Sequence, residues 1–497
     1  NGFALFQLPI PLFGKVVGIV GRNSIGKSTA LQVIAGLLQP NLGQQGREAT
    51  YQDLATRYRG SEAQLFFEKL DKGDITVSYK PQQVDLIPEQ FKGTVKELLE
   101  RVDETGKLEE VASLLDLNKF LDRDVKHLAG GELQRVAIAA SVLKKANLYL
   151  FDEPTSYLDI KQRLRVAKFI RGLADEGTAV MVIEHDLIIL DAMTDLVHLM
   201  YGKPGAFGVV SHPHATKAGI NVYLSGYLPQ ENIRFRDKPI VFEKRPPVGT
   251  RHVEQLTSWE GFEHRLGDFR LSAAAGRIDR HGVIGVLGEN GIGKTSFVKL
   301  LAGEQGDKAL QDLEMSYKPQ YLEKSDDLVL TYLQSSGALK YEQQLVAPLE
   351  LKELFQKTLR QLSGGELQRV AIAACLGRDA DLYLLDEPSA YLDVEQRLLV
   401  SKVIGGMMVA RGKSALIVDH DLLFIDYLST NLLVFDGEPA VKGCVEGPFP
   451  MEDGMNGFLE DLQITFRRDE ESGRPRVNKS GSQKDREQKA SGKLYYN

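Results

Sequence analysis

Short apolar runs that end in glycine-rich or acidic turns predict buried strands in each half of the chain. VVGIV (16–20) and VIGVL (283–287) are rich in β-branched residues, and each leads into a glycine-rich loop. The segments after these loops, TALQVIAGLL and FVKLLAG, are typical of helices. Because apolar strands of this kind alternate with helical segments, we predict an α/β fold.

A long internal repeat predicts two homologous domains. GRNSIGKST (21–29) corresponds to GENGIGKTS (288–296), and LAGGELQR (128–135) corresponds to LSGGELQR (362–369). SYKPQ, a strand that ends in Asp-Glu-Pro, and a His-Asp pair recur in the same order. A repeat of this length indicates two domains rather than an array of small units. We place a first domain at 1–220, a linker or hinge rich in Pro and Arg at 221–255, a second domain at 256–460 and a basic C-terminal segment at 461–497.

The first copy contains an insertion that the second lacks. Lys27 precedes Gln82 by 55 residues, whereas Lys294 precedes Gln320 by 26. The extra residues lie around 52–73, where apolar side chains recur at helical spacing on both sides of a Gly-Ser pair, which predicts two short helices joined by a turn. Since the second domain folds without this insertion, we expect a surface attachment that contacts a partner. The alternative is that the insertion is a surface addition without a function.

Composition restricts the class of protein. Cys375 and Cys444 are the two cysteines, so a disulfide framework or a Cys-ligated cluster cannot be built, which fits a reducing cytoplasm. No apolar run approaches the ~20 residues that span a bilayer. The net charge of −7 argues against a general polyanion binder. Residues 467–497 hold nine Lys or Arg against five Asp or Glu, and this composition alone favours a solvated, poorly packed tail.

Each glycine-rich loop has the pattern G-x-x-x-x-G-K-[ST], placed between a strand and a helix. In that setting backbone N–H groups and the helix N-terminus bind phosphates. The lysine would reach the β- and γ-phosphates, and the hydroxyl after it would ligate Mg²⁺. Ser24 replaces the glycine found at Gly291, a mild departure provided that φ is negative there. The predicted nucleotide-binding residues of these loops are Asn23, Ser24, Gly26, Lys27, Ser28 and Thr29, and Asn290, Gly291, Gly293, Lys294, Thr295 and Ser296.

Two acids follow an apolar strand in each copy, in LYLFDEP and LYLLDEP. The first acid, Asp152 or Asp386, suits Mg²⁺, and the second, Glu153 or Glu387, suits the orientation and polarisation of water. A solvated turn is the alternative, although two acids directly after a buried strand are costly without a cation or partner.

Repetition also singles out a histidine and a glutamine. His185 and His420 follow apolar strands, 32 and 33 residues beyond the two glutamates. A lone histidine at such a place is more often structural, but its recurrence favours a role in the site. Gln82 and Gln320, which follow Tyr-Lys-Pro, carry weight only because they recur.

The phrase GGELQR opens a helix whose free N–H groups can receive an anion. The serine before it, Ser363, can add a hydroxyl donor, whereas the first copy has Ala129 at this place. Because each domain already has a phosphate loop, a second phosphate-binding motif suggests that each domain completes the site of the other.

This succession of motifs resembles the Walker A loop, Gln loop, signature, Walker B strand, D-loop and His switch of the ATP-binding cassette (ABC) ATPases. YRGSE (58–62), NIRFRD (232–237), ITFRRD (464–469) and GRPRVNK (473–479) resemble more narrowly the class E twin cassettes. That family is also called the RNase L inhibitor or ribosome-recycling ATPase family. The linker and the basic C-terminal segment resemble its two hinge segments, and this resemblance implies that the C-terminal segment packs and contacts RNA rather than being disordered.

The resemblance implies two cassettes that face each other head to tail, with two sites for ATP or ADP and Mg²⁺. It assigns metal contacts to Gln82 and Gln320, and adenine stacking to Phe3 and Phe269. One site would combine Lys27, Gln82, Glu153 and His185 with Ser363, Gly364, Gly365 and Asp393; the other would combine Lys294, Gln320, Glu387 and His420 with Ala129, Gly130, Gly131 and Asp159.

The family resemblance also implies a function. ATP-driven closure would split ribosomes into subunits, with the insertion on the small ribosomal subunit (rRNA and protein), alongside a release factor or its stalled-ribosome relative, in the cytoplasm and without a membrane partner. The resemblance includes an N-terminal iron–sulfur domain, which we expect to be absent here because the chain has two cysteines and begins at Asn1. We therefore expect no iron–sulfur cluster here. The alternatives are the ATPase subunit of a membrane ABC transporter and a DNA-repair or chromosome cassette.

Overall fold

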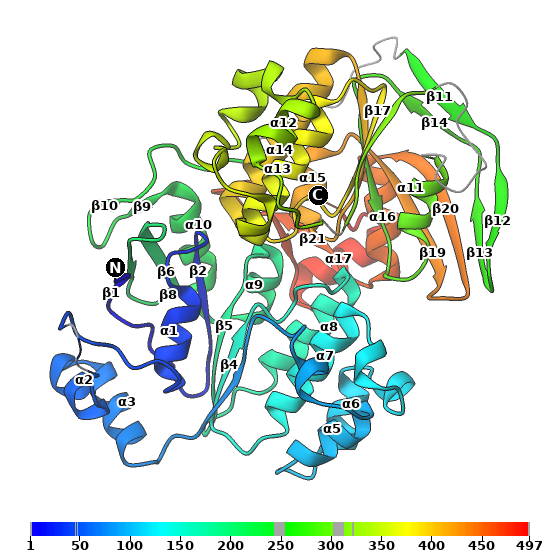
Figure 1. The fold of residues 1–497 in the computed structure, drawn as a ribbon. Helices are drawn as coiled ribbons and strands as arrows, with labels where there is room; N and C mark the ends of the chain where they lie inside the picture. Colours follow the sequence, from blue (N-terminus) through cyan, green and yellow to red (C-terminus); the bar gives the residue numbers. More distant parts are fainter. Residues whose placement is uncertain are drawn as a thin grey trace. The chain divides into compact units, whose positions relative to one another are not determined.

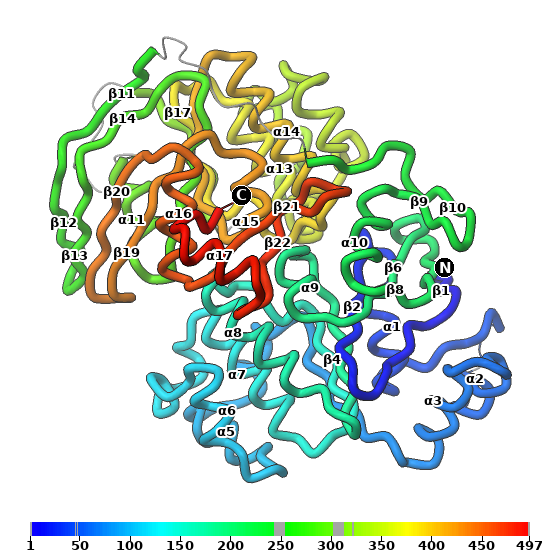
Figure 2. The backbone as a smooth tube through the Cα atoms, turned by 180° about the vertical axis from the view of Figure 1, so that it is seen from behind, coloured from blue at the N-terminus to red at the C-terminus, as the bar shows by residue number. Residues whose placement is uncertain are grey.

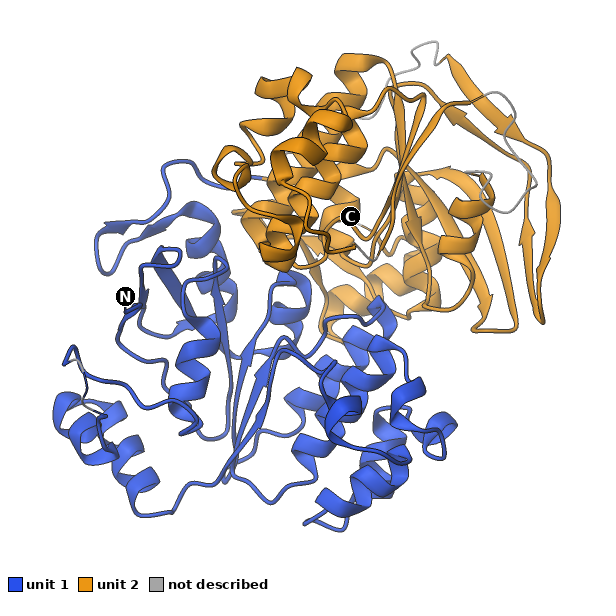
Figure 3. Cartoon of the chain, in the orientation of Figure 1, with its two compact units in different colours: residues 1–241 blue, residues 242–497 orange. Residues whose placement is uncertain are grey.

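The computed structural model describes residues 2–44, 46, 48–242, 254–301, 313–320 and 323–495. Contacts divide the chain into two compact units, unit 1 at residues 1–241 and unit 2 at residues 242–497 (Figure 3). The predicted linker at 221–255 therefore contributes residues to both units, and its positions 243–253 lie outside the described residues. The C-terminal segment 461–497 belongs to unit 2.

A mostly parallel sheet forms the centre of unit 1 (Figure 1). Strands β2, β5, β4 and β3 run parallel to their neighbours, as buried apolar runs predict. Their carboxyl ends therefore meet at one edge of the sheet, where α/β proteins bind ligands. The order of strands is β1 (Ala4–Phe6), β7 (Phe207–Val210), β6 (Leu196–Lys203), β2 (Val16–Gly21), β5 (Ala179–Ile183), β4 (Leu148–Asp152) and β3 (Val77–Lys80), and β8 (His214–Ala215) pairs with β6.

Helices connect the strands of unit 1, and a short hairpin follows the last of them. The hairpin consists of β9 (Tyr227–Leu228) and β10 (Ile233–Arg234) and lies within the predicted linker. The helices are α1 (Lys27–Ile34), α2 (Tyr51–Arg57), α3 (Glu62–Asp71), α4 (Ile87–Gln90), α5 (Val95–Val102), α6 (Leu108–Leu114), α7 (Gly130–Val142), α8 (Ile160–Arg171), α9 (Leu187–Met193) and α10 (Thr216–Ser225).

Unit 2 repeats this plan with a longer antiparallel edge. The order of strands is β12 (Phe262–Leu266), β13 (Phe269–Ala273), β20 (Lys442–Pro450), β19 (Asn431–Glu438), β15 (Val283–Leu287), β18 (Ser414–Val418), β17 (Leu382–Asp386) and β16 (Met315–Lys318), while β11 (Gln255–Trp259) pairs with β14 (Gly276–Asp279). Its helices are α11 (Lys294–Leu301), α12 (Val329–Ser335), α13 (Gly364–Gly377), α14 (Val394–Arg411), α15 (Leu422–Leu428), α16 (Met451–Asp461) and α17 (Gln483–Ser491). The two predicted phosphate loops thus follow equivalent strands, β2 and β15.

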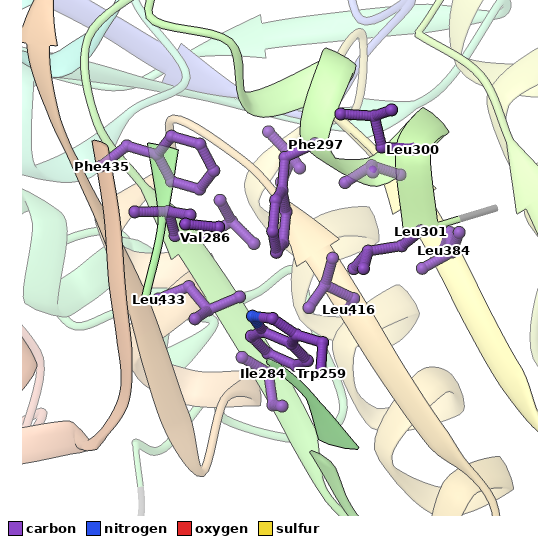
Figure 4. Packing of buried hydrophobic residues seen from close by; sticks show 14 of the residues in the cluster. Trp259, Ile284, Val286, Phe297, Leu300, Leu301, Leu384, Leu416, Leu433 and Phe435 are labelled. Atoms are coloured by element: carbon purple, nitrogen blue, oxygen red, sulfur yellow. The ribbon is translucent and has the colours of Figure 1, made fainter. Parts of the chain in front are cut away.

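Aromatic side chains pack the core of unit 2 behind its phosphate loop (Figure 4). Phe297 on α11 lies edge-on to Trp259 and Phe435, with ring centroids 5.9 and 5.6 Å apart. The Trp259 indole N–H donates a 2.8 Å hydrogen bond to the carbonyl of Ala274, so its polar atom is satisfied. This packing fixes α11 against the sheet and so holds the start of that helix at the loop.

The insertion forms the two expected helices, α2 and α3, but its inner face belongs to the core. Leu54, Phe66 and Phe67 are buried in an apolar cluster of unit 1, and the Phe67 ring stacks on Tyr58 at 5.8 Å. Leu65 is 61% exposed on the other face. The expectation of a surface attachment is therefore wrong for the inner face of the insertion, because an amphipathic helix pair buries one face wherever it attaches.

The C-terminal segment is folded, contrary to what its composition favours. Strand β21 (Phe466–Arg468) pairs with β22 (Pro475–Val477), and α17 follows (red in Figure 2). Buried polar side chains satisfy one another there: Asn478 Nδ2 donates to Thr465 Oγ1 at 2.8 Å, and the Thr465 hydroxyl donates to Asp485 Oδ1 at 2.8 Å. Paired polar groups can be buried at low cost, which composition does not show.

Candidate nucleotide sites

Both phosphate loops hold their lysine in the same way. The Lys27 ammonium donates to the carbonyls of Gly21 (3.0 Å) and Arg22 (2.6 Å). In unit 2 the Lys294 ammonium donates to Gly288 at 2.8 Å and to Glu289 at 2.5 Å. Both lysines are buried at the first position of α1 or α11. A cation fixed at a helix N-terminus, among N–H groups without helical partners, forms a site for phosphate.

Ser24 adopts a left-handed backbone, so the condition of a negative φ is not met. Its φ is 59°, close to the 77° of Gly291. The Ser24 carbonyl accepts a 2.8 Å hydrogen bond from Gly205 N, and the Gly291 carbonyl accepts one of 2.9 Å from Ala440 N. The loop therefore keeps one shape in both units, and the serine takes on a strain of about 1–2 kcal/mol to do so.

The two predicted adenine-stacking rings lie directly against the loops. A Cβ atom at Gly26 would come within 2.5 Å of Phe3 Cε1, and one at Gly293 would come within 2.8 Å of Phe269 Cε1. Both glycines also have φ near 90°. The second glycine of each loop is thus required by conformation and by the close approach of a ring. Stacking of these rings on adenine stays a prediction.

Two of the predicted metal ligands, the hydroxyl and the aspartate, lie together in each unit. Thr295 Oγ1 donates a 2.7 Å hydrogen bond to Asp386 Oδ2, and the Ser28 hydroxyl bonds Asp152 in unit 1. Burial raises the pKa of both aspartates, and the hydroxyl bonds oppose this rise. Among the described residues, Asp152 Oδ1 is buried without a hydrogen-bond partner. A hydroxyl and an unsatisfied carboxylate oxygen fit Mg²⁺, which takes its other ligands from water and substrate phosphates.

Each catalytic glutamate candidate is held by the predicted glutamine and faced by the predicted histidine. Gln82 Nε2 donates to Glu153 Oε1 at 2.7 Å, and His185 Nε2 lies 3.5 Å from the same oxygen. In unit 2, Gln320 Nε2 donates to Glu387 Oε1 at 2.7 Å, and His420 Nε2 lies 3.6 Å away. The structure therefore joins all three predicted residues in each unit. The amide nitrogen of each glutamine contacts the glutamate, and its role as a metal ligand stays a prediction.

The two glutamates differ in electrostatics. Burial raises the pKa of Glu153, but the neighbouring His185 and Lys27, together with the hydrogen bond from Gln82, bring it down to about 2. In contrast, burial and the negative charges of Asp386 and Asp419 raise the pKa of Glu387 to about 7. Equivalent positions in the repeat therefore have different surroundings.

Sequence reasoning missed the residues that hold the backbone of these acids. The buried Lys80 ammonium donates to the carbonyl of Asp152 at 3.0 Å, and Gln134 Nε2 donates to the carbonyl of Glu153 at 2.7 Å. Lys318 and Gln368 repeat these bonds in unit 2 at 2.6 and 2.5 Å. Both glutamates have φ of 46°, a conformation that needs such support. The signal was present, since SYKPQ and GGELQR each occur twice.

The signature glycines pack on the D-loop of their own unit. A Cβ at Gly131 would lie 2.9 Å from the Tyr157 carbonyl, and one at Gly365 would lie 3.0 Å from that of Tyr391. Asp159 and Asp393, in these D-loops, cap helices α8 and α14.

The start of the signature helix differs between the units. The Ser363 hydroxyl accepts from Glu366 N at 3.3 Å and caps α13, whereas Ala129 offers no such oxygen to α7. The pairing of each signature with the other unit's loop stays a prediction.

Comparison with known protein families supports the assignment of these two sites to nucleotide binding. The ABC transporter family model matches residues 13–156 and 271–390, more than half of the chain. The chain therefore belongs to the ABC ATPases and is an ATPase; this family implies binding of ATP and Mg²⁺. Among the described residues, no helix is long and apolar enough to cross a membrane.

Relatives that match the whole chain identify its family within the ABC ATPases. An uncharacterised ABC transporter ATP-binding protein of Methanocaldococcus jannaschii is 50% identical over 505 residues, covering 100% of this chain and 83% of that protein. The archaeal ribosome recycling factor aABCE1, solved with ribosomal stalk protein aP1, is 50% identical with a TM-score of 0.93, covering 100% of this chain and 98% of that one. ABCE1 in a model with ribosome-bound archaeal Pelota is 50% identical with a TM-score of 0.94, covering 100% and 85%. The chain belongs to the class E twin cassettes, the RNase L inhibitor family.

Proposed function

We propose that this ATPase splits ribosomes into subunits and then binds the small subunit. The observation that carries the proposal is likeness over the whole chain, at 50% identity, to a protein described as an archaeal ribosome recycling factor. The site supports it, because both units keep a complete set of loop lysine, Walker B acids, glutamine and histidine. Two intact sites suit a cycle in which both nucleotides are used.

Within each unit the residues have separate tasks. Lys27 and the N-terminus of α1 bind the phosphates, and the Ser28–Asp152 pair would hold Mg²⁺, which neutralises phosphate charge when bound. Glu153 is ionised near neutral pH because its pKa is about 2, so its carboxylate can orient water and accept a proton from it. His185 stabilises that charge from 3.5 Å.

The signature motifs extend the proposal to both units together. Each unit contains two phosphate-binding motifs, the phosphate loop and the start of the signature helix, although one nucleotide needs only one loop. We assign the signature of each unit to the nucleotide bound by the other. Nucleotide binding then draws the units together, and loss of the γ-phosphate releases them. This closing and release of the two units is the movement that separates the ribosomal subunits.

The outer face of the α2–α3 insertion is the proposed contact with the small ribosomal subunit. It is particular to unit 1, and Arg57, Arg59 and Leu65 are exposed on it. Basic side chains suit contact with rRNA phosphates. A release factor or its stalled-ribosome relative is the proposed second partner, and the cytoplasm is the proposed location.

Cosedimentation with small subunits tests this assignment. Deletion of 52–73 is unsuitable because it removes the buried Phe66 and Phe67. We expect Arg59→Glu with Leu65→Asp to weaken nucleotide-dependent cosedimentation at least about tenfold. The matched control, Lys119→Glu with Leu114→Asp on another exposed part of unit 1, is expected to bind normally. Equal binding by both double variants would contradict the assigned surface.

A further inference from the structure

The two glutamates Glu153 and Glu387 share nearly every contact. One carboxylate oxygen, Oε1, accepts from a glutamine at 2.7 Å in both units and faces a histidine at 3.5 or 3.6 Å. Both residues have φ of 46°, and a buried lysine and a glutamine hold the peptide in both. The difference in hydrogen bonding between the two side chains therefore lies at the other carboxylate oxygen, Oε2.

The second carboxylate oxygen separates the two sites. The Ser156 hydroxyl donates a 3.2 Å hydrogen bond to Glu153 Oε2. Unit 2 has Ala390 at this place, and among the described residues no hydrogen bond to Glu387 Oε2 is present. The preceding position differs little, because the Thr155 hydroxyl donates to Glu184 and the Ser389 hydroxyl donates to Asp419. The replacement of Ser156 by Ala390 at the equivalent position therefore removes one hydrogen-bond donor to the glutamate.

We propose that Ser156 is a positioning residue for ATP hydrolysis in unit 1, and that Ala390 leaves the glutamate of unit 2 without this restraint. The terminal torsion of a glutamate is broad, so one hydrogen bond on Oε1 leaves the plane of the carboxylate free to turn. A second bond on Oε2 fixes that plane, and with it the oxygen available to water. The sites then differ in how well the carboxylate is preorganised.

The proposal rests on ATP hydrolysis and stands apart from the ribosomal role. Hydrolysis is therefore measured on the full chain without ribosomes. Unit 1 is followed in a Glu387→Gln background, where we expect Ser156→Ala to lower kcat about 5- to 20-fold, well below the roughly 100- to 10,000-fold that a general base contributes, because Glu153 itself is kept. KM for ATP is expected to change less than about twofold, because Ser156 touches the glutamate and not the phosphate loop. Ser156→Thr keeps the hydroxyl and is expected to restore kcat to within about twofold of the parent.

The reciprocal variant keeps the test independent of the stability of Ser156→Ala. In a Glu153→Gln background, Ala390→Ser is expected to raise kcat at the unit 2 site with KM unchanged. Unchanged kcat in both Ser156→Ala and Ala390→Ser would overturn the proposal. So would an equal loss of kcat in Ser156→Ala and Ser156→Thr, or a rise in KM alone. A failure of ribosome splitting with these kinetic results intact would count against the proposed function and leave Ser156 as assigned.

Discussion

The ammonium group of Lys80 is completely buried and donates a hydrogen bond of 3.0 Å to the carbonyl oxygen of Asp152, at the end of a strand that also delivers Glu153. Burial lowers the pKa of Lys80 to about 8, and the charges of Asp152 and Glu153 oppose this decrease. The group is therefore still charged near neutral pH. Its place indicates that it holds the peptide between the two acids rather than binding substrate.

Replacement of this lysine is expected to impair hydrolysis more than nucleotide binding. Lys80→Met keeps the length of the side chain but leaves the Asp152 carbonyl without its buried donor, at about 1–3 kcal/mol. We expect kcat at the unit 1 site to fall about tenfold or more, with a small change in KM, as measured by phosphate release. Lys72→Met, at an exposed position, is the control. Parental kcat in Lys80→Met would remove this positioning role.

The contact of Phe3 with Gly26 makes the phosphate loop sensitive to a single methyl group. Gly26→Ala would meet the ring at 2.5 Å and also places a side chain at φ of 94°. We expect nucleotide affinity to fall at least about tenfold, equal to 1.4 kcal/mol, in equilibrium titration. Gly43→Ala is a matched control, since φ is 82° there but nothing lies within 4 Å. If Gly26→Ala bound nucleotide as tightly as Gly43→Ala and the parent, neither the Phe3 ring nor the left-handed backbone would require a glycine at position 26.

Substitution of Ala129, at the start of the signature helix of unit 1, is expected to increase both stability and nucleotide affinity. In unit 2 the Ser363 hydroxyl accepts a hydrogen bond from Glu366 N and caps its helix. Ala129→Ser would give the signature helix of unit 1 an equivalent hydroxyl, and a cap of this kind stabilises a helix start by about 0.5–2 kcal/mol. We expect unit 1 to unfold at a higher temperature in a thermal scan, and nucleotide affinity at the Lys294 loop to rise. The reciprocal Ser363→Ala is expected to weaken affinity at the Lys27 loop. Affinities that stay as in the parent in both variants would make the alanine silent.

The C-terminal segment is expected to depend on one carboxylate. Burial opposes ionisation of Asp485, but hydrogen bonds from Gly481 N and Thr465, with Lys489, bring its pKa below 3.8. A lowered pKa in the folded state contributes stability that is complete above about pH 4 and is lost as pH falls through the folded value. Asp485→Asn should therefore speed proteolysis of the segment at pH 7, and the difference from the parent should shrink in acid. Equal proteolysis at pH 7 would contradict this network.

Local sequence patterns were sufficient to predict the strands and loops whose structure depends on neighbouring residues. The apolar runs before each loop became β2 and β15, and the strands that end in Asp-Glu became β4 and β17. The phosphate loop lysines, the acids, the glutamines and the histidines meet as predicted, because parallel strands bring their carboxyl ends to one edge. Because each motif occurs twice in the chain, the repeat itself marked the residues that form the sites.

Other features depend on contacts between distant segments and could not be read from local patterns. The left-handed Ser24 is stabilised by a hydrogen bond from Gly205 N, far along the chain. The buried face of the insertion depends on where α3 packs, and the folded C-terminal segment depends on Asn478 and Asp485 meeting Thr465. Composition reports polarity, but it does not report whether polar groups are paired.

The splitting of ribosomes by the full chain tests the central claim most directly. Light scattering of ribosomes after addition of the chain, a release factor and ATP reports separation of subunits. We expect splitting with the parent chain, none when both Lys27 and Lys294 are changed to Ala, and nucleotide-dependent retention on small subunits when Glu153→Gln and Glu387→Gln are combined. No splitting by the parent, together with cosedimentation that is the same with and without nucleotide, would contradict the account.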